Sequence, residues 1–294
     1  MGRYACPRRC GPISAAAKRS CRWRAEPVVE QVQQDGWRPK LVALDIDGTV
    51  VDHAGRLPDP VREAVQRVLA AGVPVVLSTG RSWHATRPVF DALGLPPGYA
   101  VSSNGAVVVE YPPSEVIRQV TFDPADVIDK VTRFAPDALI ATEVVGHGYR
   151  VSAQFPAGDL DGEITVESAE QLRREPVTRV IIRDPGSSDE DFIALAEQLG
   201  LHGVSYFIGY SAWLDIAPEG VHKATGLAEV CDRLGVDRAD VLAMGDGRND
   251  IEMLQWAGRG VALGDAPGEV QQAADAVTGL FDDGGTPAEL ARWF

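Results

Sequence analysis

Residues 41–50 of this 294-residue chain read Leu-Val-Ala-Leu-Asp-Ile-Asp-Gly-Thr-Val. The apolar start fits a strand buried on both faces, because parallel strands in α/β proteins are continuous apolar runs. Side chains alternate along a strand, so Asp45 and Asp47 point the same way if the strand persists to them. Two carboxylates there resist burial, and Mg²⁺, which prefers oxygen ligands, would compensate. Gly48 permits a tight turn whose backbone N–H groups face an anion.

The same stretch is also compatible with a strand followed by an Asx-type turn, with both aspartates solvated, because Asp and Gly are common in loops. The residues that follow favour a site. Strands at 41–46, 73–77 and 99–103 alternate with helices at 61–71 and 82–93. Strand–helix–strand units at this spacing predict an α/β fold with a doubly wound, Rossmann-like parallel sheet.

The regular alternation stops after residue 109 and resumes near residue 213. We therefore predict a core domain made of 41–121 and 210–294, with an inserted α/β cap domain at 122–209. In the cap we expect helices at 124–135, 168–174 and 189–199 and strands near 138–145, 149–155, 177–183 and 204–209. In the second core segment we expect helices at 223–234, 250–257 and 267–274 and strands at 241–244 and 260–263.

Charge is unevenly distributed along the chain. The net charge is -14, but residues 1–40 hold nine Lys or Arg and three Asp or Glu, so residues 41–294 carry -20. An acidic body disfavours nucleic acid as a partner, because it repels phosphate backbones. No apolar run approaches the roughly 20 residues that cross a bilayer, so we expect no membrane association. The sequence leaves the oligomeric state undetermined.

Residues 1–40 are basic, rich in Arg, Pro and Ala, and only loosely similar to a transit peptide. They lack the apolar segment of a secretory signal, so we expect a disordered tail. Cys6, Cys10 and Cys21 lie in this tail and match no common zinc spacing, and four cysteines in a chain of this length form no disulfide framework. We therefore expect free thiols and a cytoplasmic protein.

Polar clusters follow several predicted strands or begin helices. They are Asp45 with Asp47, then Thr79, then Lys223, then the segment 245–250, Gly-Asp-Gly-Arg-Asn-Asp. In open α/β sheets, ligands bind outside the carboxyl ends of the strands, so these clusters can meet in one crevice. A carboxylate nucleophile, a second carboxylate for proton transfer, a cation, a lysine and a hydroxyl together suit phosphoryl transfer.

The motifs resemble those of the haloacid-dehalogenase-like (HAD) phosphohydrolase superfamily, and most closely its Cof-type branch with a large cap. The similarity extends over residues 41–294 and keeps the motif order. The matching stretches are Asp45-Ile46-Asp47-Gly48-Thr49, Ser78-Thr79-Gly80-Arg81, Asn104-Gly105-Ala106, Val221-His222-Lys223-Ala224-Thr225-Gly226-Leu227 and Gly245-Asp246-Gly247-Arg248-Asn249-Asp250.

This resemblance implies a Mg²⁺-dependent phosphomonoesterase that acts on a small phosphorylated metabolite, such as a sugar phosphate, through an aspartyl-phosphate. Two alternatives stay open, a phosphomutase and a catalytically idle, phosphate-binding regulatory module. The resemblance implies that Asp45 is the nucleophile and Asp47 the general acid/base. Mg²⁺ would be held by Asp45, the Asp47 backbone carbonyl and Asp246, with Asp250 in contact with the metal or one layer behind it. The phosphoryl group would be bound by Thr79, Gly80, Lys223 and Asn249. Arg81 would order the loop or touch substrate.

Overall fold

Two β-sheets organise the residues that the computed structural model describes, which are 36–184, 186, 204–209 and 213–294. The expected helix at 189–199 and most of the expected tail, with Cys6, Cys10 and Cys21, lie outside these residues. The first sheet has the strand order β14 (Ala276–Val277), β13 (Arg259–Ala262), β12 (Val241–Gly245), β1 (Leu41–Leu44), β2 (Val75–Ser78), β3 (Gly98–Ser102), β4 (Val107–Tyr111) and β5 (Glu115–Gln119).

The strands from β14 to β3 are all parallel, whereas β4 and β5 add an antiparallel edge. Leu44 at the end of β1 pairs with Met244 on one side and with Leu77 on the other. The carboxyl ends of three central strands therefore lie level with one another. The predicted Rossmann-like parallel core is confirmed, and β5 is an addition that the sequence pattern did not indicate.

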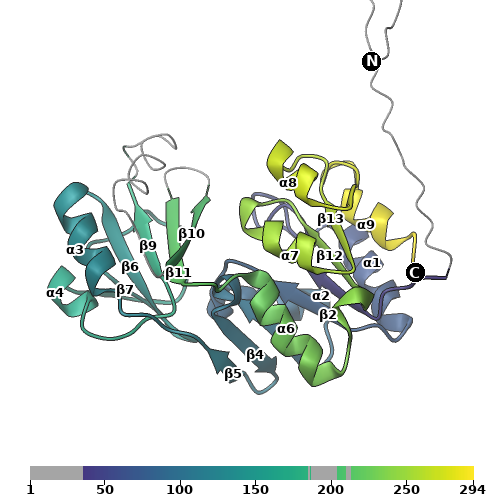
Figure 1. The fold of residues 1–294 in the computed structure, drawn as a ribbon, viewed down its shortest axis with the longest axis horizontal. Helices are drawn as coiled ribbons and strands as arrows, with labels where there is room; N and C mark the ends of the chain where they lie inside the picture. Colours follow the sequence, from purple (N-terminus) through teal and green to yellow (C-terminus); the bar gives the residue numbers. More distant parts are fainter. Residues whose placement is uncertain (1–35, 185, 187–203, 210–212) are drawn as a thin grey trace, which may run out of the picture. The chain divides into compact units, whose positions relative to one another are not determined.

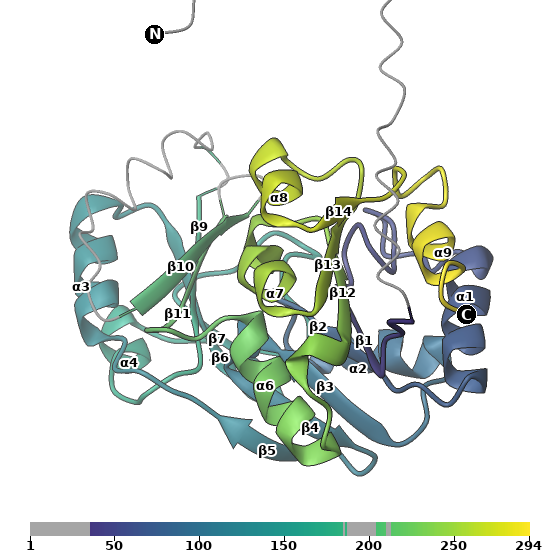
Figure 2. The ribbon, with the colours of Figure 1, turned by 45° about the vertical axis from the view of Figure 1, so that its right-hand side comes forward.

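Helices cover the two faces of this sheet (Figure 2). Helices α6 (Lys223–Leu234), α7 (Ile251–Trp256) and α8 (Gly268–Ala273) lie on one side of the parallel strands, and α1 (Asp59–Ala70) and α9 (Gly285–Leu290) lie on the other. The first group buries Leu227, Met253 and Val270 against apolar side chains of the sheet such as Ala43 and Ala243. Burial on both faces explains why β1 reads as an uninterrupted apolar run.

Helix α2 (Trp83–Leu93) starts and stops where its sequence directs. The hydroxyl of Ser82 accepts a hydrogen bond from the Ala85 amide at 3.3 Å, which satisfies one free N–H of the first turn. Gly94 ends the helix in the left-handed conformation, with φ of 65°. This helix follows directly on Thr79, Gly80 and Arg81, so its cap fixes the position of that loop.

The second sheet has the order β10 (Val204–Gly209), β11 (Trp213–Pro218), β9 (Val180–Arg183), β6 (Leu139–Val144), β7 (Gly148–Val151) and β8 (Glu163–Val166). Helices α3 (Ala125–Phe134) and α4 (Ala169–Leu172) lie side by side along it (Figure 1). They pack against a cluster that includes Val180, Ile182, Leu214 and Ile216. Because side chains alternate along a strand, the odd-numbered residues of β9 and β11 occupy the opposite face.

The second sheet extends beyond the range expected for the cap. Strand β11 pairs antiparallel with both β9 and β10, whereas the sequence placed 210–294 in the core. Residues 38–294 form one compact unit by their contacts, and the division into core and cap stays a proposal. Among the described residues, no helix combines the length and apolar character needed to span a bilayer.

Candidate active site

A cavity of about 430 Å³ opens at the carboxyl ends of the central parallel strands. Asp45 follows β1, Thr79 follows β2 and Asp246 follows β12, and all three line it. Side chains of the second sheet, among them Arg179 and Asp215, line the same cavity. The structure therefore brings the dispersed polar clusters of the sequence together at one place.

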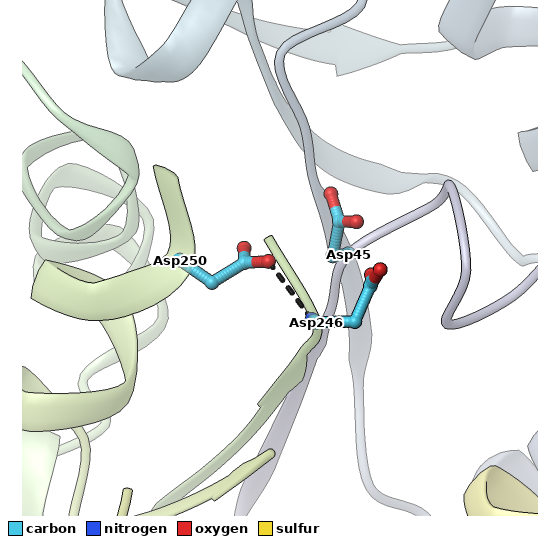
Figure 3. A group of neighbouring side chains, drawn as sticks. All are labelled: Asp45, Asp246 and Asp250. Carbon is cyan, nitrogen blue, oxygen red and sulfur yellow. Dashed lines mark hydrogen bonds between the residues drawn. The ribbon is translucent and has the colours of Figure 1, made fainter. Parts of the chain in front are cut away.

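Three carboxylates form an acidic cluster at this cavity: Asp45 and Asp246 line it, and the fully buried Asp250 lies beside them (Figure 3). One oxygen from each lies within 4.8 Å of the others. Burial and then the charge of Asp250 raise the pKa of Asp45 well above its usual range. The same two causes raise the pKa of Asp246 to about 7. Like charges held this close require a cation or protons.

Lys223 supplies one positive charge to the cluster. Its Nζ lies 2.6 Å from Asp45 Oδ1 and 2.6 Å from Asp250 Oδ1, and its side chain is fully buried. Burial lowers the pKa of Lys223, but Asp250 and Asp45 together raise it by more, so the amine stays protonated. Lys223 is the first residue of α6. It contacts Asp45 although the two residues are 178 positions apart in the sequence.

Asp250 is occupied on both of its oxygens. Oδ1 accepts from Lys223, and Oδ2 accepts from the backbone amides of Asp246, at 3.1 Å, and Gly247, at 2.9 Å. The carboxylate lies so close to β12 that a Cβ on Gly245 would be 2.3 Å from its Cγ. Asp250 thus fixes both Lys223 and the loop that carries Asp246.

Gly48 allows the loop after β1 to approach Asp246. Its φ of +73° lies in the left-handed region, and a Cβ there would lie 2.4 Å from Asp246 Oδ2. The adjacent Thr49 hydroxyl donates to Asp246 Oδ1 at 3.3 Å. The turn predicted at Gly48 therefore exists, but the expectation that its amides face an anion was wrong. The Gly48 amide donates to the Val51 carbonyl, and the Thr49 and Val50 amides donate to the Ile46 carbonyl.

Asp47 lies apart from the acidic cluster. Strand β1 ends at Leu44, so the alternation that would have aligned Asp45 with Asp47 does not continue to Asp47. The Asp47 carboxylate is exposed and is bound by Arg81, with Nε 2.9 Å from Oδ2 and Nη2 2.5 Å from Oδ1. Arg81 thus contacts an acid at the cavity, and hydrogen bonding to Asp47 raises its own pKa.

The residues expected to bind phosphate lie beside the acidic cluster. Thr79 Oγ1 accepts from the Arg81 amide at 3.1 Å. Asn249 Nδ2 donates to Asn104 Oδ1 at 3.0 Å, and a Cβ on Gly80 would contact both asparagine side chains at 3.2–3.3 Å. Thr79, Gly80 and Asn249 all line the cavity.

Among the cavity residues without a role assigned from the sequence are Asn104, Arg179 and Asp215. Asn104 lies in a recognised motif, but Arg179 and Asp215 have no motif of their own. Asp215 lies between the buried residues Leu214 and Ile216 in β11. A single polar residue in an otherwise apolar strand could have indicated a functional role. Arg179 stands just before β9, where no comparable pattern marks it.

The chain is similar to known hydrolases and phosphatases. A family model described as haloacid dehalogenase-like hydrolase matches residues 42–289. The 5-amino-6-(5-phospho-D-ribitylamino)uracil phosphatase YitU of Bacillus subtilis is 28% identical, over 87% of this chain and 98% of its own length. The phosphoglycolate phosphatase of Natronomonas pharaonis is 30% identical, over 83% of this chain and 93% of its own.

A solved structure repeats the fold. BT1666 from Bacteroides thetaiotaomicron, described among the phosphatases of the haloalkanoate (HAD) enzyme superfamily, superposes with a TM-score of 0.72 at 28% identity. The match covers 90% of this chain and 98% of that one. The family resemblance that the motifs indicated is confirmed over nearly all of residues 41–294.

Proposed function

Because this chain belongs to the haloacid dehalogenase-like hydrolase family and is a phosphatase, we propose that it hydrolyses a small phosphomonoester through an aspartyl-phosphate, with Mg²⁺. The observation that carries the proposal is that Asp45 and Asp246 lie together at one cavity, with the buried Lys223 amine 2.6 Å from Asp45. The substrate is a small metabolite such as a sugar phosphate, because Thr79, Gly80 and Asn249 line a cavity to which both sheets contribute.

Asp45 is the proposed nucleophile. Lys223 binds Oδ1, so we assign attack on phosphorus to Oδ2, which forms the acyl-phosphate bond as the ester oxygen departs. Lys223, Thr79, the Gly80 amide and Asn249 hold the phosphoryl oxygens and stabilise the charge that develops on them. Water then attacks the acyl-phosphate, which releases inorganic phosphate and restores the Asp45 carboxylate.

Asp47 is the proposed general acid/base, and Arg81 is the residue that orients it. Asp47 donates a proton to the departing ester oxygen and afterwards accepts one from the attacking water. Arg81 contacts both of its oxygens, so one of these contacts must open when the proton moves. Arg81 therefore acts on the reaction through the position of Asp47.

The acidic cluster fits a Mg²⁺ ion. Its donors are all carboxylate oxygens, which Mg²⁺ prefers, and the raised pKa values of Asp45 and Asp246 indicate negative charge that Lys223 alone leaves unbalanced. Asp45, Asp246 and the Asp47 backbone carbonyl would hold the ion. Asp250 would lie one layer behind, because Lys223 and two amides occupy its oxygens. When bound, the ion neutralises charge on the phosphoryl oxygens.

Replacing Asp45 by Asn tests the nucleophile. We expect Mg²⁺-dependent phosphate release from p-nitrophenyl phosphate in the wild type and its loss in Asp45→Asn, because a neutral amide does not attack phosphorus. Mass spectrometry of acid-quenched wild type should show phosphorylation on the peptide that contains Asp45. Release that survives Asp45→Asn defeats the mechanism, and conversion of a sugar phosphate into its isomer without phosphate release would indicate a phosphomutase.

A further inference from the structure

A buried charged network connects the second sheet to the phosphate-binding loop. Its centre is Arg179, which is 4% exposed, between Glu143 and Asp215, which are each 6% exposed. Arg179 donates to the Gly80 carbonyl and to the Tyr149 hydroxyl, and its Nη1 lies 3.2 Å from Asp215 Oδ2. The network therefore contains one cation and two acids, and each is more than nine-tenths buried.

Several polar atoms of this network have no hydrogen-bond partner, among them the donor Nε of Arg179. Glu143 Oε2 accepts from Ser103 at 2.6 Å and from Thr178 at 3.1 Å. Asp215 Oδ2 accepts from Asn104 at 3.2 Å as well as from Arg179. The second oxygen of each acid, Glu143 Oε1 and Asp215 Oδ1, has no hydrogen-bond partner. A buried carboxylate oxygen without a donor is costly, so one is expected from elsewhere.

Only one of these two acids reaches the cavity. Asp215 lines it, together with the aromatic rings of Tyr149 and Trp213, whereas Glu143 does not. Asp215 is also linked to the proposed phosphate site, since Asn104 donates to it and accepts from Asn249. A leaving group that extends from the phosphoryl position toward the second sheet would therefore meet Asp215.

The charge of this wall restricts what it can accept. Asp159 and Asp161 line the same cavity, and Arg179 is already bound to acids. A second anionic group on the substrate would be repelled here, whereas hydroxyl or amino groups would find acceptors and aromatic faces. Burial, partly offset by Arg179, raises the pKa of Asp215 to about 6, so at pH 7.5 the side chain is an acceptor.

We infer that Asp215 determines substrate specificity: its Oδ1 accepts a hydrogen bond from a hydroxyl or amino group of the leaving group. The inference rests on the proposed phosphatase function and narrows it. The preferred substrates are phosphomonoesters of polyols or amino-polyols, and phosphorylated carboxylic acids such as phosphoglycolate are poor ones.

Matched substrates test the inference in the wild-type protein. Sorbitol 6-phosphate is compared with hexyl phosphate, and glycerol 3-phosphate with propyl phosphate, so that each pair differs only in hydroxyl groups. We expect kcat/KM to be at least about tenfold higher for the polyol in one pair or both, because an unfilled buried acceptor penalises a substrate that lacks the donor. Equal values in both pairs overturn the inference.

The variant Asp215→Asn adds a signature that a structural role would not produce. Arg179 and Asn104 both donate to Oδ2, so they will select the amide oxygen of Asn there and leave Nδ2, a donor, in the place of the unpartnered Oδ1. The polyol-to-alkyl ratio of kcat/KM should fall about tenfold or more, and phosphoglycolate should improve relative to both. The matched control is Glu143→Gln, which alters the same network outside the cavity and should leave the ratio unchanged.

These experiments distinguish failure of the inference about Asp215 from failure of the proposed phosphatase function. If the wild type fails to hydrolyse p-nitrophenyl phosphate with Mg²⁺, the proposed function and the inference both fail. If it does so without a polyol preference, or if Asp215→Asn and Glu143→Gln change the ratio equally, the inference alone fails. If Asp215→Asn does not fold, the wild-type ratios decide.

Discussion

Arg81 binds both carboxylate oxygens of Asp47: Nε lies 2.9 Å from Oδ2 and Nη2 lies 2.5 Å from Oδ1. In Arg81→Ala, Asp47 loses this constraint, so we expect kcat on alkyl phosphates to fall roughly tenfold to a hundredfold, because proton transfer depends on geometry. p-Nitrophenyl phosphate should lose less, since its leaving group departs without a proton.

Steady-state kinetics on both substrate types measures the effect of Arg81→Ala. Arg248→Ala is the control, because Arg248 also lines the cavity but is paired with Glu269. Equal losses on the two substrate types in Arg81→Ala would show that Arg81 does not act through Asp47.

Lys223→Met leaves Asp45 and Asp250 as buried carboxylates without their shared cation. We expect the free energy of unfolding of the metal-free protein to fall by about 3–5 kcal/mol, the usual result of removing one partner from a buried ion pair. Urea denaturation measures it. Adding Asp250→Asn to Lys223→Met should recover part of the loss, and a double variant with no recovery would contradict this account.

Mg²⁺ affinity should depend on pH through Asp246. In the metal-free protein its pKa is about 7, above the ordinary carboxyl value, so below pH 7 the ion must displace a proton. Affinity should therefore be highest above pH 7 and fall as the pH drops below it, because protons compete with the ion at Asp246 and also at Asp45, whose pKa is raised as well. Calorimetric titration from pH 5.5 to 8.5, in buffers of different ionisation enthalpy, measures affinity and proton release; a pH-independent affinity contradicts the prediction.

Gly48→Ala should weaken metal binding. The new methyl group would lie 2.4 Å from Asp246 Oδ2, so Asp246 or the loop must move. Gly55→Ala is a matched control, with φ of +75° against +73° and open space around its Cβ. Both variants should lose about 1–2 kcal/mol of stability from the left-handed backbone. Only Gly48→Ala should raise the Mg²⁺ concentration needed for half-maximal activity; equal shifts would argue against the contact.

The parallel core could be predicted because its signals are local. Asp45, Thr79 and Asp246 each directly follow an apolar strand, and in an open α/β sheet such positions lie at the same edge. The helix that starts at Lys223 could be predicted equally well. The position of Asp47 outside the acidic cluster could not be predicted, because it depends on where β1 ends, and β1 ends at Leu44.

The second sheet was harder to predict from sequence. Strand β8 is short and largely exposed, so it lacks an apolar pattern. Strand β11 lies close before the Lys223 motif, which suggested that it belonged to the core. The network around Arg179 arises from pairing of β6, β9 and β11, which are far apart in sequence, so no local pattern reveals it.

The alternation of side chains in β9 and β11 separates two kinds of mutation. Even-numbered residues such as Ile182 and Leu214 support α3 and α4, whereas Arg179 and Asp215 on the opposite face line the cavity. Changes on the cavity face can alter which molecule is accepted while the supporting layer stays intact. A lineage that carries this sheet can therefore acquire new substrates by a few exchanges on one side, without rebuilding its hydrophobic support.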